Sequence, residues 1–114
     1  MTRRLWAAAC LTILSLPVGH QVLAAPFHYF GVGTNSCGWW TEVRRHQGTA
    51  TWAEQWALGF LAGASDFGPS GLDPLGDTDA EGAWAWVDRY CSSHPTDRVI
   101  KALEELTKAR SGAL

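Results

Sequence analysis

Two cysteines, Cys37 and Cys91, constrain the fold of this chain more than any other feature of its 114 residues. The third cysteine, Cys10, lies in an N-terminal segment that we expect to be removed, which leaves an even count. In a small exported domain, two thiols normally form one disulfide rather than a metal site or a redox centre. The sequence therefore predicts a disulfide between Cys37 and Cys91. It would close a loop of about 55 residues, for which the chain-entropy relation gives about 4 kcal/mol of stabilisation.

The first 24 residues have the three parts of a secretory signal peptide. Arg3 and Arg4 form a basic start, an apolar run covers residues 5–18, and small residues precede a cut after Ala24. The apolar run is shorter than the roughly 20 residues that span a bilayer. We therefore expect residues 25–114 to form a single exported domain, in the periplasm or secreted. No stable membrane anchor would remain after cleavage of the signal.

The mature chain would be weakly acidic. Without Arg3 and Arg4 it carries seven Lys and Arg against 11 Asp and Glu, a net charge of −4 with histidine neutral. Proteins bind nucleic acid through clustered basic side chains, and here only Arg44 and Arg45 are adjacent. The composition therefore argues against a nucleic-acid partner, and no motif requires a cofactor.

Periodicity and capping signals predict an all-α fold, a small four-helix orthogonal bundle with a single disulfide. An extended aromatic arm over residues 25–34 precedes the bundle. The predicted helices cover residues 36–46, 52–64, 78–92 and 95–109. Ser36 should be the N-cap of the first helix, and capping boxes should open the second at Thr51 and the third at Thr78. Pro95 suits the first turn of the fourth helix.

Six tryptophans remain beyond the signal, an unusual number for a domain of this size. They either build the core, since each ring buries on the order of 150–250 Å², or form a contact surface, since tryptophan is favoured at interfaces. In the second helix, Trp52, Trp56 and Phe60 predict the apolar face. Trp56 and Trp84 each lie in the middle of the apolar face of their helix, and they should be among the most buried residues. Trp86 lies about 200° around the helix from Trp84 and should be more exposed.

A loop rich in glycine and proline over residues 65–76 is long for so small a domain, and we expect it to face a partner. Gly59 and Gly63, one helical turn apart in the preceding helix, predict close packing on a neighbouring helix. The candidate binding surface consists of Trp39, Phe67, Leu72 and Trp86.

One acidic stretch matches the outline of a calcium loop, with oxygen ligands at positions 1, 3, 5 and 12 and glycine at position 6. The residues are Asp77, Asp79, Glu81, Gly82 and Asp88. Glutamate at position 5 is too long for the usual geometry, and aspartate at position 12 is a poor bidentate ligand. Acidic residues also favour a helix N-terminus. We prefer that interpretation, and we expect no metal site.

No arrangement of nucleophile, base and orienting acid is visible. His28, His46 and His94 fall on the arm, a loop and a turn between helices, and both cysteines are better used in the disulfide. His94 stands before a proline, where a capping or turn role is more typical than a catalytic one. The sequence therefore predicts a protein that is not an enzyme.

The mature chain resembles the HdeA/HdeB-type periplasmic proteins of Gram-negative bacteria. The resemblance rests on Cys37 followed by aromatic residues, on the central helix over residues 55–59, and on residues 87–95, which run into a final helix. It implies a periplasmic helical domain and acid-stress chaperoning by a dimer that loosens at low pH. A looser resemblance is to exported immunity proteins of the Rap1a/Tai type, although those tend to be richer in cysteine.

Two classes of binding function follow as expectations. The first is an exported periplasmic binding protein that acts as an acid-stress chaperone on unfolded clients, with a homodimer as its neutral form. The second is an immunity or inhibitor protein that binds a toxin or an envelope hydrolase. The charged residues of the chain support the first class, because they make it respond to acid. Below pH 3 the 11 carboxylates become largely neutral, and the mature chain reaches a net charge of about +10.

Overall fold

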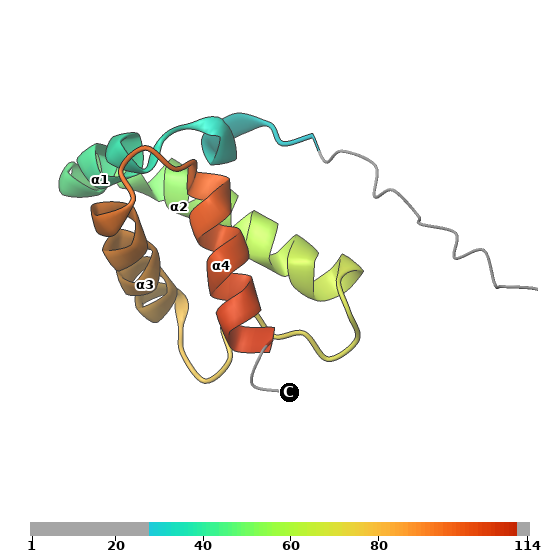
Figure 1. The fold of residues 1–114 in the computed structure, drawn as a ribbon. Coiled ribbons are helices and arrows are strands. Elements are labelled where there is room, and N and C mark those ends of the chain that lie inside the picture. The colour runs from blue at the N-terminus through green and yellow to red at the C-terminus, as the bar shows by residue number, and fades with distance from the viewer. Residues whose placement is uncertain (1–27, 112–114) are drawn as a thin grey trace, which may run out of the picture.

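The structure is a computed structural model that describes residues 28–111. In chain order, a 3₁₀ helix η1 (Gly31–Thr34) is followed by α1 (Cys37–Arg45), α2 (Gln47–Phe67), α3 (Ala80–Ser93) and α4 (Val99–Ser111). The predicted all-α fold is confirmed. In Figure 1, α3 and α4 lie side by side and α2 passes behind α4. The predicted signal peptide, residues 1–24, lies outside the described residues.

The predicted disulfide between Cys37 and Cys91 is confirmed. The two Cα atoms are 4.6 Å apart, and the bond joins the start of α1 to the end of α3. Both cysteines are fully buried. The covalent link therefore lies inside the core, where it fixes two helices that are distant in sequence.

The first turn of α1 is held by the connection between α3 and α4. The side chain of Ser36 accepts a hydrogen bond from the amide of Trp39, as predicted for the N-cap. The amides of Cys37 and Gly38 have no partner within α1, because they lie at its start. They donate instead to the carbonyl oxygens of Asp97 (2.7 Å) and Pro95 (2.9 Å).

Three predicted helix starts are wrong. The second helix begins at Gln47, so Thr51 lies inside it and does not cap it. The fourth begins at Val99, not at Pro95. Pro95 belongs to a turn whose carbonyl groups receive the α1 amides, and that long-range pairing outweighs the local preference of proline for a first helical turn. The third helix is capped by Asp79, which accepts from the amide of Gly82, rather than by Thr78.

The buried face of α2 consists of small residues. Ala53 and Ala57 are fully buried and Leu61 is nearly so, whereas Trp52 is 54% exposed. Trp56 and Phe60 are only partly buried and stack on each other, with ring centroids 6.1 Å apart. The predicted apolar face, and with it the strong burial of Trp56, is therefore wrong. Alanines let α2 approach the bundle closely, and the large rings flank this contact.

The centre of the core is formed by Trp40 and Trp84, whose ring centroids are 6.0 Å apart. Trp84 is 2% exposed, so its predicted burial is confirmed. Trp86 lies on another side of α3, is partly buried and stacks on Tyr90, so the predicted difference between the two tryptophans is also confirmed. Other members of the core are Val32, Val87, Val99, Ala102, Leu103 and Leu106.

The described part of the predicted arm consists of two segments with different structures. Residues 28–30 have no regular secondary structure, and residues 31–34 form η1 instead of an extended chain. Val32 inserts into the core with 2% of its surface exposed. The hydroxyl of Tyr29 donates to a carboxylate oxygen of Glu104 on α4 at 2.6 Å. Residues 25–27 lie outside the described residues.

The predicted close helix packing at Gly59 and Gly63 is wrong, because a Cβ atom at either position would meet nothing within 4 Å. The close approach occurs at Gly33 instead. A Cβ atom there would lie 2.5 Å from the Trp56 ring and 3.2 Å from Cβ of Ile100.

Replacement of Gly33 by alanine should therefore lower the free energy of unfolding by about 1–3 kcal/mol through overpacking. Gly59→Ala is the matched control, and it should raise the free energy of unfolding by up to about 1 kcal/mol, since alanine is the better helix former. Urea unfolding of both variants measures the two changes. Equal effects of the two substitutions would contradict the packing described for η1.

Candidate functional site

One polar cluster links three helices. Arg44 on α1 donates to both carboxylate oxygens of Asp88 on α3, with its Nε 3.2 Å from Oδ1 and its Nη2 3.1 Å from Oδ2. Its Nη1 donates to Glu54 on α2. The indole nitrogen of Trp40 donates to the same Oδ1 of Asp88 at 2.8 Å. We call these four residues, Trp40, Arg44, Glu54 and Asp88, the Arg44 cluster.

The Arg44 cluster is partly shielded from water. The side chains of Arg44 and Glu54 are 23% and 19% exposed. Burial lowers the pKa of Arg44, but its hydrogen bonds to Asp88 and Glu54 and their charges outweigh this effect and leave the pKa raised. The guanidinium therefore stays charged at every pH that the protein meets. Two surface hollows border the cluster. Glu81 lines the hollow beside Glu54, and Arg45 lines the hollow beside Asp88.

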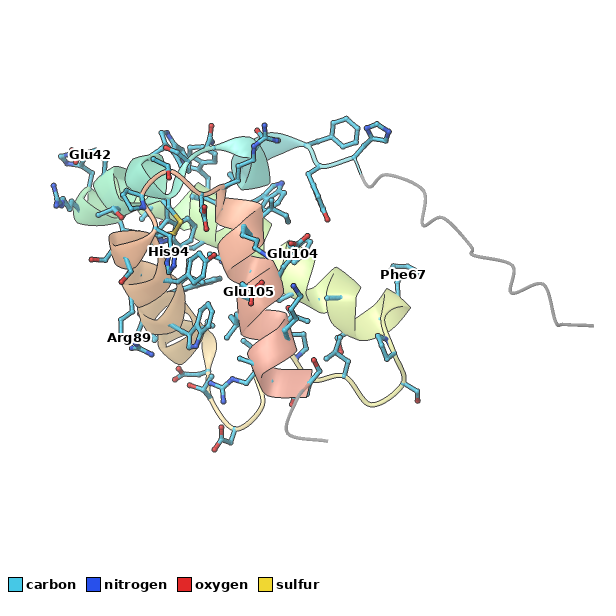
Figure 2. The ribbon with its side chains drawn as sticks, in the orientation of Figure 1. Glu42, Phe67, Arg89, His94, Glu104 and Glu105 are labelled. Atoms are coloured by element: carbon cyan, nitrogen blue, oxygen red, sulfur yellow. A yellow bond between two sulfur atoms is a disulfide. The ribbon has the colours of Figure 1, made fainter. Side chains whose placement is uncertain are left out.

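The four residues of the predicted binding surface do not form one patch. Trp39 on α1 is partly buried with its ring edge-on to Trp52, at 5.5 Å between centroids. Trp86 lies on α3. Phe67, at the end of α2, is 88% exposed and projects away from the bundle (Figure 2). Leu72 is 8% exposed, so the expectation that it contributes to an exposed surface is wrong.

The loop after α2 begins three residues later than predicted and is partly buried. Helix α2 extends to Phe67, so the connection covers residues 68–79. The hydroxyl of Ser65 donates to the carbonyl oxygen of Leu72 at 3.0 Å, which ties the loop back to the helix. Leu72 and Pro74 are both buried. This tie explains why a segment rich in glycine and proline turns an apolar side chain inward.

An apolar groove, which was not predicted from the sequence, runs along the outer side of α2. Residues of α2, the arm and the following loop line it: Tyr29, Gly59, Phe60, Gly63, Ala64, Phe67 and Gly68. A second hollow continues it toward α4, where Glu104, Thr107 and Lys108 complete the lining. The signal in the sequence was the spacing of Gly59, Gly63 and Phe67, one helical turn apart.

The carboxylates of the calcium-loop outline serve different partners. Asp79 caps α3, Asp88 belongs to the Arg44 cluster, and Asp77 lies 3.3 Å from Nη1 of Arg110. Within residues 28–111, no group of three or more His, Cys, Asp or Glu side chains is placed to hold a metal ion.

His94 is the C-cap of α3, as expected from its position before Pro95. Its ring stacks on Tyr90 at 4.3 Å, and its Nδ1 lies 2.9 Å from the Tyr90 carbonyl oxygen. The hydroxyl of Tyr90 donates to Asp97 at 2.7 Å. These contacts assign His94 to the ordering of the turn that carries Pro95 and Asp97.

No family model, characterised protein or solved structure matches this chain. In the part of the chain that the structure describes, none of the helices combines the length and the apolar character needed to cross a membrane.

Proposed function

We propose that this chain is an exported periplasmic protein-binding domain, related in action to the HdeA/HdeB-type acid-stress chaperones. At neutral pH the bundle is closed. In acid, α2 separates from the pair formed by α1 and α3, and the uncovered apolar faces hold unfolded client proteins. The observation that carries this proposal is the Arg44 cluster, in which Arg44 of α1 is bound to α2 through Glu54 and to α3 through Asp88.

The cluster is suited to respond to acid because its two anions come from different helices. Carboxylates lose their charge below about pH 4, whereas Arg44 keeps its charge. Loss of the negative charge on Glu54 would end its attraction to the guanidinium, and α2 would lose this ionic link to α1. Charge-assisted hydrogen bonds contribute about 1.5–3 kcal/mol each when shielded, and less when partly exposed.

A second ionic contact, between Glu105 and two lysines of α4, also weakens as the pH falls. Hydrogen bonds from Lys101 and Lys108 lower the pKa of Glu105 on α4. A carboxyl group with a lowered pKa in the folded state stabilises the fold at neutral pH, and this contribution is lost as the pH falls through that pKa. At the same time the net charge rises to about +10, so electrostatic repulsion favours opening.

The disulfide would limit the opening. It holds α1 and α3 together through Cys37 and Cys91, so separation of α2 leaves these two helices joined. The surfaces uncovered would be the alanine face of α2 and the buried tryptophans Trp40 and Trp84. Large aromatic rings bury much apolar area on contact with a client.

The test uses an isosteric variant, Glu54→Gln with Asp88→Asn, which removes both negative charges of the Arg44 cluster at neutral pH. It should unfold or open about 1–3 kcal/mol more readily at pH 7. It should also suppress aggregation of an unfolded enzyme at a higher pH than the wild type. Light scattering of the client from pH 7 to pH 2.5 measures this. The control is Glu42→Gln with Asp66→Asn, which removes two exposed charges and should leave the profile unshifted.

The proposal fails if the wild type protects no client at any pH. It also fails if the cluster variant and its control have the same pH profile, because acid would then act elsewhere.

The second candidate function, an immunity or inhibitor protein for a toxin or an envelope hydrolase, is favoured by the groove on α2. The groove is open in the closed bundle, and Phe67 at its end is 88% exposed. A folded partner could bind there without any acid step. Capture of one stoichiometric partner from periplasm at pH 7, with no client protection in acid, would favour this function.

A further inference from the structure

We propose that the surface between α2 and α4 is a binding site for an extended peptide segment that carries a tyrosine, and that residues 28–30 of the chain occupy this site as a displaceable strap. This site goes beyond acid chaperoning, because it requires no acid opening of the bundle, and it names the kind of segment that the groove of the second candidate function would accept.

The floor of the site is continuous beneath Tyr29. Phe60 and Ala64 line the hollow along α2 and also the hollow beside α4, and Tyr29 contributes to both. The surface over Gly59 and Gly63 is open, since a Cβ atom at either position would meet nothing within 4 Å. Removal of Tyr29 would therefore join the two hollows into one apolar groove.

Tyr29 is bound in the way that a ligand side chain would be. It lines both hollows together with Phe60 and Ala64, and its hydroxyl donates to Oε1 of Glu104 at 2.6 Å. Figure 2 shows Glu104 on α4, on the flank nearer to α2. The site therefore combines an apolar floor with one carboxylate acceptor, which fits a tyrosine better than an aliphatic side chain or phenylalanine.

The strap has a pivot at its junction with the core. Gly31 has a φ of 74°, a conformation that glycine adopts readily and other residues rarely do. Immediately after it, Val32 is anchored with 2% of its surface exposed. On the other side of the pivot, Phe30 is extended and 78% exposed. Residues 28–30 can therefore leave the groove by rotation at Gly31 while the core stays intact.

The conformation of the strap defines the ligand. It is an extended segment, it places one aromatic ring between the two hollows, and it leaves the space over Gly59 and Gly63 for a neighbouring apolar side chain. The strap competes with any such ligand, so the apparent affinity is reduced by the fraction of molecules in which the groove is free.

The experiment measures binding of a fluorescein-labelled peptide that copies residues 25–33, by fluorescence anisotropy at pH 7. The Tyr29→Ala variant of the chain should bind this peptide at least about tenfold more tightly than the wild type, because its strap no longer competes. A peptide with alanine in place of its tyrosine should bind at least about tenfold more weakly. Tyr29→Phe in the chain should give a smaller gain, and it decides the question if Tyr29→Ala does not fold.

The position of the site is tested by adding Gly63→Leu to the Tyr29→Ala variant. Leucine fits the open space and is a better helix former than glycine, so the helical circular dichroism should be kept while peptide binding is lost. The proposal is overturned if the Tyr29 variants bind the peptide no more tightly than the wild type, or if Gly63→Leu leaves the affinity unchanged.

Discussion

Replacement of Trp84 by alanine should lower the free energy of unfolding by about 3–5 kcal/mol, the range observed when a large buried ring is removed. Trp84 is 2% exposed and packs on Trp40 at the centre of the core. A domain of this size has a total stability of roughly 0.05–0.15 kcal/mol per residue. The loss is therefore a large fraction of the total stability, and the urea midpoint of the variant should fall strongly.

Trp86→Ala is the matched control, because it removes the same side chain from the same helix. Trp86 is partly buried and stacks on Tyr90 with 5.7 Å between ring centroids. Its loss should cost less than half as much as the loss of Trp84. Urea unfolding followed by circular dichroism compares the two variants. Equal costs would contradict the assignment of the inward and outward sides of α3.

The double substitution Cys37→Ala and Cys91→Ala should cost about 4 kcal/mol. The residues are 54 positions apart in sequence, so the disulfide closes a long loop and removes much conformational entropy from the unfolded chain. Alanine is the appropriate replacement because both side chains are fully buried in apolar surroundings. The free energy of unfolding in urea measures the cost, with the slope fitted separately for each protein because the unfolded chain expands once the disulfide is absent.

Reduction of the wild-type disulfide provides the control for this variant, since it breaks the same link without changing the core residues. The two measurements should agree to within about 1 kcal/mol, apart from the small loss of packing at alanine. A cost below about 1 kcal/mol in both would mean that the disulfide adds little to the fold.

Features that depend on local sequence were predictable. Ser36 caps α1 because its hydroxyl and the amide of Trp39 are close in sequence. The burial of Trp84 follows from helical periodicity in α3. The disulfide followed from the cysteine count and an expected oxidising compartment.

Features that depend on long-range packing were not predictable. The side of α2 that faces inward was misassigned, because periodicity gives the spacing of a stripe but does not show whether rings or alanines face the core. The start of α4 depends on hydrogen bonds from Cys37 and Gly38 to the turn that contains Pro95, and residues nearly 60 positions apart give no local signal for such pairing.

The candidate site was missed for the same reason. Arg44, Glu54 and Asp88 come from three helices. The sequence offered only an adjacent pair of arginines, a capping box from Thr51 to Glu54, and a calcium-loop outline that ends at Asp88. That glutamate pairs with Arg44 rather than capping a helix. Phe67 was identified, but its neighbours in the groove come from one and two turns earlier in α2 and from Tyr29 on the arm.

Hydrogen exchange of the wild type at pH 7 and at pH 3, corrected for the intrinsic exchange rate at each pH, tests most directly the claim that acid separates α2 from the disulfide-linked pair. The account predicts that amides of α2 over residues 53–61 lose protection at pH 3, while those of α1 and α3 next to Cys37 and Cys91 keep it. Equal protection in all helices at both pH values would contradict it. So would a simultaneous loss of protection in α1, α2 and α3, which indicates global unfolding.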